Sequence, residues 1–289
     1  MPKTPATKPF FSIVIPTLNE EKYLPLLLED LSKQTFKNFE VIHIDGQSTD
    51  KTLEEAKKFS KKLQLTSQTI DQQNVAAQRN TGAKVSRGEW VIFMDADNRL
   101  RPSFLQDVHQ QLTNTPHTDV FTCLIDVDKD DLLKIATQRA INYVLELYFL
   151  FNKPSGFGAL IGCRKKILDE FSFDEQQKIY EDSLFLNALK DAGYHFQLFK
   201  KPTYNYSLRR IEKEGTLKML RISAQMNLQY LRGKDFQQQD FGYTMQGGDY
   251  YDQPSIFHLV NLKSMWDELS QQQKTRAKKL LKMLRELKF

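Results

Sequence analysis

Residues 90–100 read WVIFMDADNRL, an apolar run of strand character that ends in two carboxylates one residue apart. If the strand geometry persists, the side chains of Asp95 and Asp97 leave the chain on the same side. Two neighbouring carboxylates repel each other, and a divalent cation relieves that repulsion. Oxygen ligands of this kind suit Mg²⁺ or Mn²⁺. The pair is therefore a candidate metal site, with an ordinary polar turn as the alternative.

Strand-like and helical patterns alternate from the N-terminus to about residue 128. The strand candidates are FFSIVIP (10–16), FEVIHID (39–45), LTSQTID (65–71) and the run before Asp95. The helical patterns between them cover residues 19–34, 48–63 and 74–88. This order predicts an α/β fold with a Rossmann-like, mostly parallel central sheet and helices on its faces.

Polar residues follow three of these strands, in the segments PTLNE, DGQSTD and DADN. Ligands of open α/β sheets bind beyond the carboxyl ends of the strands, so we expect the site there. Helix capping alone explains many of these polar residues, namely Asn19, Glu20, Ser48, Thr49 and Asp50. Capping does not explain Asp45, which stands at a strand end.

The second half of the chain has a different pattern. A helical stretch (131–151) leads into the glycine-rich run SGFGALIGCRKK (155–166), the helix YEDSLFLNALKDAG (180–193) and the strand HFQLFK (195–200). The glycine spacing does not match G-x-G-x-x-G. From there to the end the sequence is mainly helical, broken by a Gln- and Tyr-rich loop at 235–254 that we expect to be mobile.

Composition limits the class of protein. The net charge is +5, from 41 basic and 36 acidic residues, and the basic excess is concentrated in residues 274–289. Such a tail suits an anionic surface, phospholipid or nucleic acid, and a solvated amphipathic helix is the alternative. The two cysteines predict buried thiols in a reducing compartment. No signal peptide is evident, and the longest apolar stretch (141–151) is too short to span a bilayer. We expect a cytoplasmic protein, soluble or peripheral at the inner face of the membrane.

Five blocks of sequence carry a family resemblance. In order they are IVIPTLNE, IDGQSTDKT, AAQRNTGAKVSRGEWVIFMDAD, YEDSLF and SLRRIEKEG, between residue 11 and about residue 220. Together they resemble the family 2 glycosyltransferases, inverting and nucleotide-sugar-dependent enzymes with the GT-A fold. The resemblance implies a nucleotide-sugar-binding half (1–128), an acceptor-side and catalytic-base half of the same domain (129–212), and a helical C-terminal extension (213–289).

The resemblance also implies a nucleotide-sugar site, which consists of Pro16, Asn19, Glu20, Asp45, Arg79, Asn80, Asp95, Arg209 and Arg210. Asp45 would meet the uracil edge, although Gln47 departs from the commoner DDGS sequence and weakens a uridine-specific interpretation. Asp97, with Asp95 in its shell, would bind the Mn²⁺ or Mg²⁺ that bridges the two phosphates. A surface salt bridge is the alternative for Arg79.

Transfer of a sugar needs a base and a stabilised leaving group. By the resemblance, Asp182 within YEDSLF would be the catalytic base, with Glu181 as its partner or as a helix-start charge. Arg209 and Arg210 suit the departing pyrophosphate, because arginine forms bidentate contacts with phosphate. A solvated basic turn is their alternative.

The resulting hypothesis is a hexosyltransferase-type glycosyltransferase that moves a sugar from a nucleoside diphosphate sugar, UDP-linked by family precedent, to an acceptor hydroxyl or phosphate. A catalytically inactive nucleotide-sugar-binding or scaffold protein is the alternative. Nucleic-acid binding has only the basic tail in its favour, and the acidic strand ends oppose it. The acceptor is left open between a lipid-linked molecule and a polysaccharide. The aromatic residues of 142–151 pack in the core or, with the basic C-terminal helix, contact a membrane surface.

Overall fold

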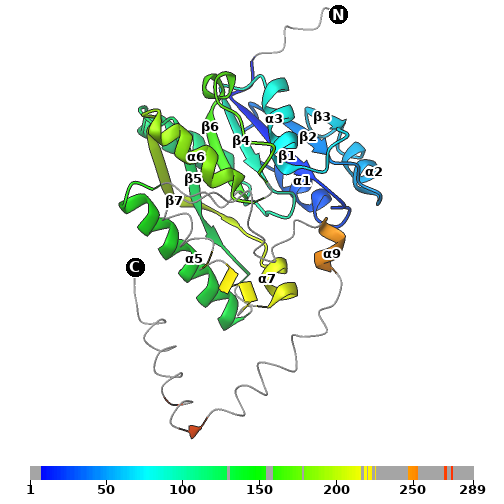
Figure 1. The fold of residues 1–289 in the computed structure, drawn as a ribbon. Helices are drawn as coiled ribbons and strands as arrows, with labels where there is room; N and C mark the ends of the chain where they lie inside the picture. Colours follow the sequence, from blue (N-terminus) through cyan, green and yellow to red (C-terminus); the bar gives the residue numbers. More distant parts are fainter. Residues whose placement is uncertain are drawn as a thin grey trace, which may run out of the picture.

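The computed structural model describes residues 8–128, 131–153, 159–177, 179–215, 218–219, 221–222, 225, 247–252, 270–271 and 275. Within these residues the chain forms one seven-stranded sheet with the strand order β3-β2-β1-β4-β6-β5-β7 (Figure 1). The strands are β1 (Phe11–Thr17), β2 (Phe39–Asp45), β3 (Leu65–Thr69), β4 (Trp90–Met94), β5 (Val120–Asp126), β6 (Leu160–Arg164) and β7 (Phe196–Asn205).

Helices surround this sheet in the described part of the chain (Figure 1). They are α1 (Leu24–Ser32), α2 (Thr52–Lys57), α3 (Val75–Val85), α4 (Phe104–Asn114), α5 (Leu132–Leu150), α6 (Glu181–Asp191), α7 (Arg209–Glu214) and α9 (Gly248–Asp252), with a 3₁₀ turn η1 (Lys165–Asp169).

The first half of the sheet is parallel, as the sequence predicts. β1 pairs in parallel with both β2 and β4, and β2 pairs in parallel with β3. Every residue of β1, β2 and β4 is buried, which fits strands covered on both faces. The carboxyl ends of β1, β2 and β4 therefore lie at one edge of the sheet, and the polar segments that follow them lie together.

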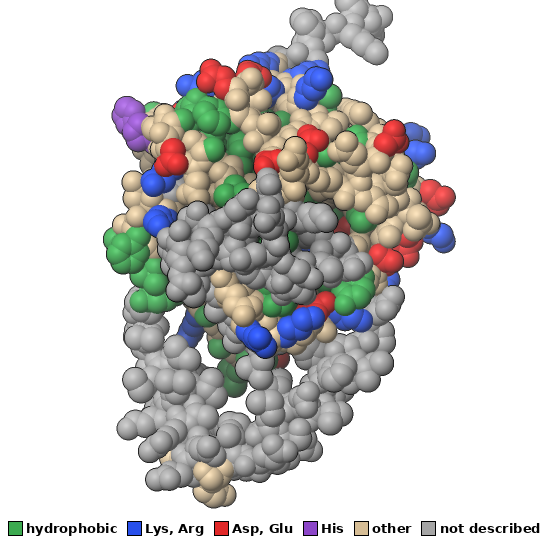
Figure 2. All heavy atoms as spheres, in the orientation of Figure 1, with side chains coloured by type: hydrophobic (Ala, Val, Ile, Leu, Met, Phe, Trp, Pro, Cys, Tyr) green, Lys and Arg blue, Asp and Glu red, His purple; other side chains and the backbone are tan. Residues whose placement is uncertain are grey.

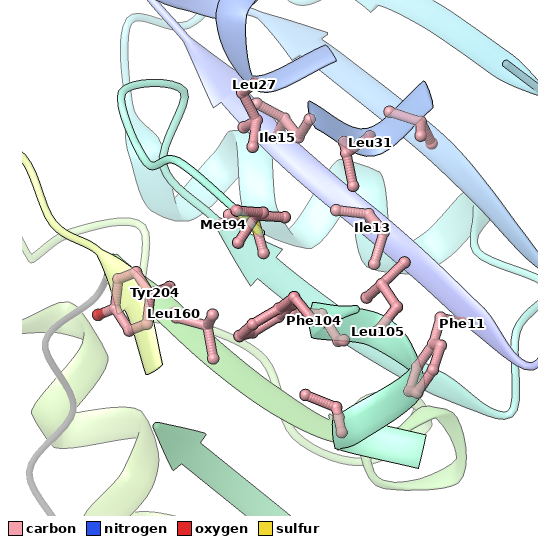
Figure 3. Close-up of a cluster of buried hydrophobic side chains, with 14 of the residues drawn as sticks. Phe11, Ile13, Ile15, Leu27, Leu31, Met94, Phe104, Leu105, Leu160 and Tyr204 are labelled. Atoms are coloured by element: carbon pink, nitrogen blue, oxygen red, sulfur yellow. The ribbon is translucent and has the colours of Figure 1, made fainter. Parts of the chain in front are cut away.

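Two apolar layers cover the two faces of the sheet. On one face, alternate residues of β1 pack with leucines of α1 and with residues of α4 (Figure 3). The residues labelled there are Phe11, Ile13, Ile15, Leu27, Leu31, Met94, Phe104, Leu105, Leu160 and Tyr204. On the other face, Val14 and Ile44 pack with small residues of α3 and with apolar residues of α6. Helices on both faces confirm the predicted α/β class.

β6 was not predicted from the sequence. It lies between β4 and β5 and runs antiparallel to both, so the second half of the sheet is mixed. Glycine is required at position 162 for steric reasons, because an added Cβ would lie 2.1 Å from the Phe121 ring. Cys163 in β6 and Cys123 in β5 are free and buried, as expected.

α5 is as long as predicted but is not a core helix. Among its residues only Leu145 is buried, and Leu150 and the following Phe151 are 75% and 71% exposed. The core interpretation is therefore wrong for Tyr143 and Phe151, which are exposed, whereas Tyr148 and Phe149 are half-buried. None of the described helices is both long and apolar enough to cross a membrane. The basic segment 274–289, apart from Thr275, and most of the loop predicted at 235–254 lie outside the described residues.

Candidate functional site

The ends of β1 and β2 are joined by a network of hydrogen bonds in which neutral donors surround the Asp45 carboxylate. The Asp45 side chain is fully buried. Its Oδ1 accepts from the hydroxyls of Thr17 (3.1 Å) and Ser48 (2.5 Å), and its Oδ2 accepts from the Ser48 backbone N–H (2.9 Å). In this arrangement the carboxylate holds the loop after β2, and the loop covers it.

His43 extends the network beneath Asp45. Its Nε2 lies 2.7 Å from the Thr17 hydroxyl and its Nδ1 lies 2.8 Å from the Ser67 hydroxyl. Because Thr17 donates to Asp45, it accepts from Nε2–H, and Nδ1 in turn accepts from Ser67. Burial lowers the pKa of His43 to about 4, so the ring is neutral at physiological pH.

Asn19 links the loop after β1 to the loop after β2. Its backbone N–H donates to the Ser48 hydroxyl (2.8 Å), and its Oδ1 accepts from the Thr49 backbone N–H (2.8 Å). The capping explanation is wrong for Asn19 and Ser48, because α1 starts at Leu24 and α2 at Thr52. The two residues instead tie neighbouring strand ends together.

A buried arginine joins the end of β4 to the start of α6. Arg79 donates from Nη1 to Glu181 Oε1 (2.8 Å) and lies 3.5 Å from Asp95 Oδ1 through Nη2. Burial opposes the charge on Arg79, and Glu181 and Asp95 outweigh it and raise the arginine pKa. The Asp95 side chain is partly accessible, yet desolvation raises the pKa of its carboxyl. Arg79 is thus a buried ion-pair partner rather than a surface one.

Asp97 is held by an arginine from the distant α7. Arg209 donates from Nε to Asp97 Oδ2 (2.8 Å) and from Nη2 to Glu20 Oε1. Its guanidinium lies 4.5 Å from the centre of the Tyr23 ring. Burial raises the pKa of the Glu20 carboxyl to about 8, although Arg209 acts in the opposite direction. Arg209, Asp97 and Glu20, predicted separately from the sequence, therefore form one cluster.

Asp182 lies at the start of α6, next to the buried Glu181. Its Oδ1 accepts from the Ser183 backbone N–H (2.7 Å), and its charge contributes to the raised pKa of Arg79. The preceding Tyr180 has a left-handed backbone with φ of 62°. Arg79 thus links Asp95 after β4 to the turn that carries Asp182.

Three other predicted residues have different surroundings. Asn80 donates to the Phe173 carbonyl (2.9 Å) and accepts from the Phe173 N–H (2.9 Å), so it anchors the segment before α6. Pro16 is buried in β1 opposite Ile44. The Arg210 guanidinium lies 4.9 Å from the centre of the Tyr251 ring.

The residues fit a divalent metal that takes most of its ligands from outside the protein. Among the described residues, no group of three or more His, Cys, Asp or Glu side chains could hold a metal by itself. Mg²⁺ in phosphate-handling sites uses one or two carboxylates together with phosphate oxygens and water. Asp97, at a strand end beside a guanidinium, matches this pattern.

Sequence reasoning missed the contacts that assemble this cluster. Asp97 and Arg209 are 112 residues apart, and Tyr23 and Tyr251 also contact the guanidinium. No periodic pattern connects such distant positions. The sequence placed Tyr251 and Asp252 in a loop, whereas the structure places them in α9.

The fold is that of GT-A glycosyltransferases. A mannosyltransferase from Pyrobaculum calidifontis, solved with GDP-mannose and Mn²⁺, matches with a TM-score of 0.58 and 18% identity over 75% of this chain and 62% of its own. The structure of S. aureus TarS 1–349 with UDP-GlcNAc matches with a TM-score of 0.53 and 27% identity, over 68% of this chain and 58% of that one.

The sequence comparison defines the family. The model described as glycosyl transferase family 2 matches residues 12–172, and the chain belongs to this family. The poly(ribitol-phosphate) beta-N-acetylglucosaminyltransferase TarS of Staphylococcus aureus (strain Mu50) is 36% identical over 242 residues, which cover 74% of this chain. The chain spans 40% of the length of that relative.

Proposed function

We propose that this protein transfers a sugar from a nucleoside diphosphate sugar to an acceptor hydroxyl or phosphate, with inversion and with the help of a divalent metal. The observation that carries the proposal is the pairing of Asp97 with Arg209 at the carboxyl edge of a parallel sheet, where Arg79 also links Asp95 to Glu181 at the start of α6. A UDP-linked donor is the first choice, because TarS was solved with UDP and with UDP-GlcNAc.

The residues at the end of β4 would handle the departing pyrophosphate. Asp97 would hold Mg²⁺ or Mn²⁺, with Asp95 beside it, and the bound metal would neutralise charge on the leaving group. Arg209 and Arg210 would contact the same phosphates, since a guanidinium matches two phosphate oxygens at once. The negative charge of the leaving group would then be neutralised by the metal on Asp97 and by the two arginines at the start of α7.

Asp182 would be the base that removes the acceptor proton. The acceptor oxygen then bonds to the anomeric carbon while the bond from that carbon to the pyrophosphate oxygen breaks on the opposite face, which inverts the configuration. A base must keep a fixed position relative to the donor. The buried pair of Arg79 and Glu181 supports this role, because it ties the start of α6 to Asp95.

The loops after β1 and β2 would receive the nucleoside. Pro16, Asn19 and Glu20 stand at the end of β1, where the fold predicts the base and ribose. A direct bond from Asp45 to uracil would require displacement of Ser48, which now covers the carboxylate. Asp45 would otherwise act by shaping the loop that meets the base.

Nucleic acid is not a proposed partner. On the face shown in Figure 2, acidic and basic side chains of the described residues are interspersed rather than gathered into a basic patch. For the acceptor we propose two classes, a lipid-linked molecule and a polysaccharide. Exposed apolar residues of α5 would suit the lipid-linked class and a peripheral position at the inner face of a membrane.

A donor panel tests the proposal. Release of nucleoside diphosphate from UDP- and GDP-sugars would be measured with each acceptor class, in Mn²⁺ and in EDTA. We expect one donor to be consumed, only with metal, and not by Asp97→Asn. Donor binding without turnover under every condition would favour the inactive scaffold instead.

A further inference from the structure

Arg209 is enclosed by acidic side chains from separate parts of the chain. Besides Asp97 and Glu20, Asp252 of α9 approaches it, with 3.8 Å between Asp252 Oδ1 and Arg209 Nη1. The side chain of Arg209 is only 12% exposed. A guanidinium is not deprotonated in proteins, so the charge of Arg209 is permanent. The proposed metal ligand Asp97 is therefore in contact with a permanent positive charge.

α9 completes this enclosure by docking on the loop after β1. The Gly248 N–H donates to the Leu18 carbonyl (2.8 Å), and Asn19 Nδ2 donates to Asp249 Oδ1 (3.1 Å). Lys22 forms an ion pair with Asp252 Oδ2 (3.1 Å). An added Cβ at Gly248 would stand 2.5 Å from the Asn19 carbonyl oxygen, so the contact requires glycine. Figure 1 shows α9, in orange, near α1 and α7.

The cluster is tightly packed but not fully satisfied. Glu20 Oε2, Arg209 Nη1 and Asp252 Oδ1 are buried without a hydrogen-bond partner among the described groups. Buried polar atoms without partners cost free energy. A ligand that offers new partners to Arg209 therefore meets an arginine that still has bonding capacity.

We propose that Arg209 is a resident counter-ion that competes with the divalent metal for Asp97 and moves to the donor's pyrophosphate when metal and donor bind together. The Asp252 carboxylate and Tyr251 ring of α9 position Arg209 for this exchange. The inference rests on the proposed function and deepens it.

The exchange has a thermodynamic consequence. Metal alone must displace a cation from Asp97 Oδ2, whereas metal with a nucleoside diphosphate offers Arg209 new anionic partners. By linkage, each ligand then favours the other. Loss of the Arg209 charge should therefore strengthen binding of metal alone and weaken binding of nucleotide.

The test is Mn²⁺ binding without nucleotide, followed by UDP titration in saturating Mn²⁺. We expect Arg209→Met to bind Mn²⁺ alone roughly tenfold more tightly, the size of one partly buried ion pair, and UDP roughly tenfold more weakly. Arg87→Met is the matched control, because Arg87 makes the same Nε and Nη2 contacts with Glu40, before β4 and away from the site. It should leave both affinities unchanged.

Two further variants guard the interpretation. Arg210→Met removes the same charge one residue away and should tighten Mn²⁺ binding less than Arg209→Met does. Equal tightening would show a general field effect and overturn the exchange. Arg209→Gln removes the charge but retains an N–H that can donate to Asp97, so it tests the exchange if Arg209→Met does not fold. It should tighten binding of Mn²⁺ alone by roughly threefold.

The outcomes separate the two proposals. Unchanged or weaker Mn²⁺ binding by both Arg209→Met and Arg209→Gln would overturn the exchange, while the proposed function would stand if the unsubstituted protein binds UDP with Mn²⁺. Failure of the unsubstituted protein to bind any nucleotide in Mn²⁺ would overturn the proposed function, whatever the metal data show.

Discussion

Asp45 and Asp97 both follow parallel strands at the same edge of the sheet, but their partners differ. Asp45 is buried and accepts hydrogen bonds from Thr17, at the end of the neighbouring strand β1, and from Ser48 in the loop after β2. Asp97 is bonded by the cation of Arg209, which comes from the distant α7. Hydrogen bonds from neutral donors thus hold the loops around Asp45, whereas Asp97 is paired with a cation. On the function and exchange proposed above, this difference in partner distinguishes the structural Asp45 from an Asp97 that takes part in donor binding.

The largest expected effect is on turnover, and it concerns Asp182, one of the acids of the proposed active site. Asp182→Asn should lower turnover by about 10²- to 10⁴-fold, the usual contribution of a general base, and leave donor affinity unchanged. Turnover and donor binding would be measured on the same preparation. Asp191→Asn, at the exposed far end of α6, is the matched control. Full activity of Asp182→Asn would remove it as the base.

The next effect tests whether the charged residues also hold the fold together. Glu181→Gln removes the charged partner that lies 2.8 Å from the buried Arg79 guanidinium, and should lower the free energy of unfolding by about 3 kcal/mol. Chemical denaturation measures it. Glu89→Gln, which removes an exposed partner of Arg164, should cost less than about 1 kcal/mol. Similar small losses in both variants would mean that the buried pair has no special role.

The hydrogen-bond network around Asp45 and His43 should make the free energy of unfolding depend on pH. Because burial lowers the folded-state pKa of His43 from 6.5 to about 4, the unfolded state binds protons more readily between these values. Stability contributed by neutral His43 is present above pH 6.5 and is lost as pH falls towards 4. We expect a loss of about 2 kcal/mol between pH 7 and pH 5.

Denaturation of His43→Gln at the two pH values checks this. The variant should be less stable at pH 7 and should vary less with pH. His195→Gln, at an exposed histidine, should keep the pH dependence of the unsubstituted protein. If the free energy of unfolding of His43→Gln kept the same pH dependence, protonation of His43 would not be its cause.

The smallest effect tests backbone strain in the loop that covers Asp45. Gln47 is exposed and has a φ of 65°, a region that favours glycine. Gln47→Gly should therefore raise the free energy of unfolding by about 0.5–1 kcal/mol. Lys57→Gly, in α2, should lower it instead, because glycine weakens a helix. A destabilised Gln47→Gly would show that the Gln47 side chain matters to the loop.

The sequence predicted the parallel half of the fold because its signals are local. Mainly apolar runs at β1, β2 and β4 predict buried strands, and the polar segments directly after them indicate where the candidate site lies. β6 escaped prediction because five residues with a glycine inside a glycine-rich run carry too little pattern. The capping interpretation of Asn19 failed because the chain makes a further turn before α1 starts at Leu24.

The assembly of the site was less predictable than its members. Asp97, Arg209 and Glu20 were each identified, but nothing local indicates that one guanidinium binds both acids. The structure supplies this contact by placing α7 and α9 against the loop after β1. Arg79, predicted beside the nucleotide, is buried between Glu181 and Asp95, and no local signal indicated this pair of partners. Ion pairs between residues far apart in the sequence can be identified only once the tertiary fold is known.

Calorimetric titration with UDP and with GDP, each in Mn²⁺ and in EDTA, tests the central claim most directly. The experiment would be run on the unsubstituted protein and on Asp97→Asn. We predict that one nucleotide binds only in Mn²⁺ and that Asp97→Asn loses this binding. Equal nucleotide affinity in EDTA, or unchanged affinity in Asp97→Asn, would contradict a metal-assisted donor site on Asp97.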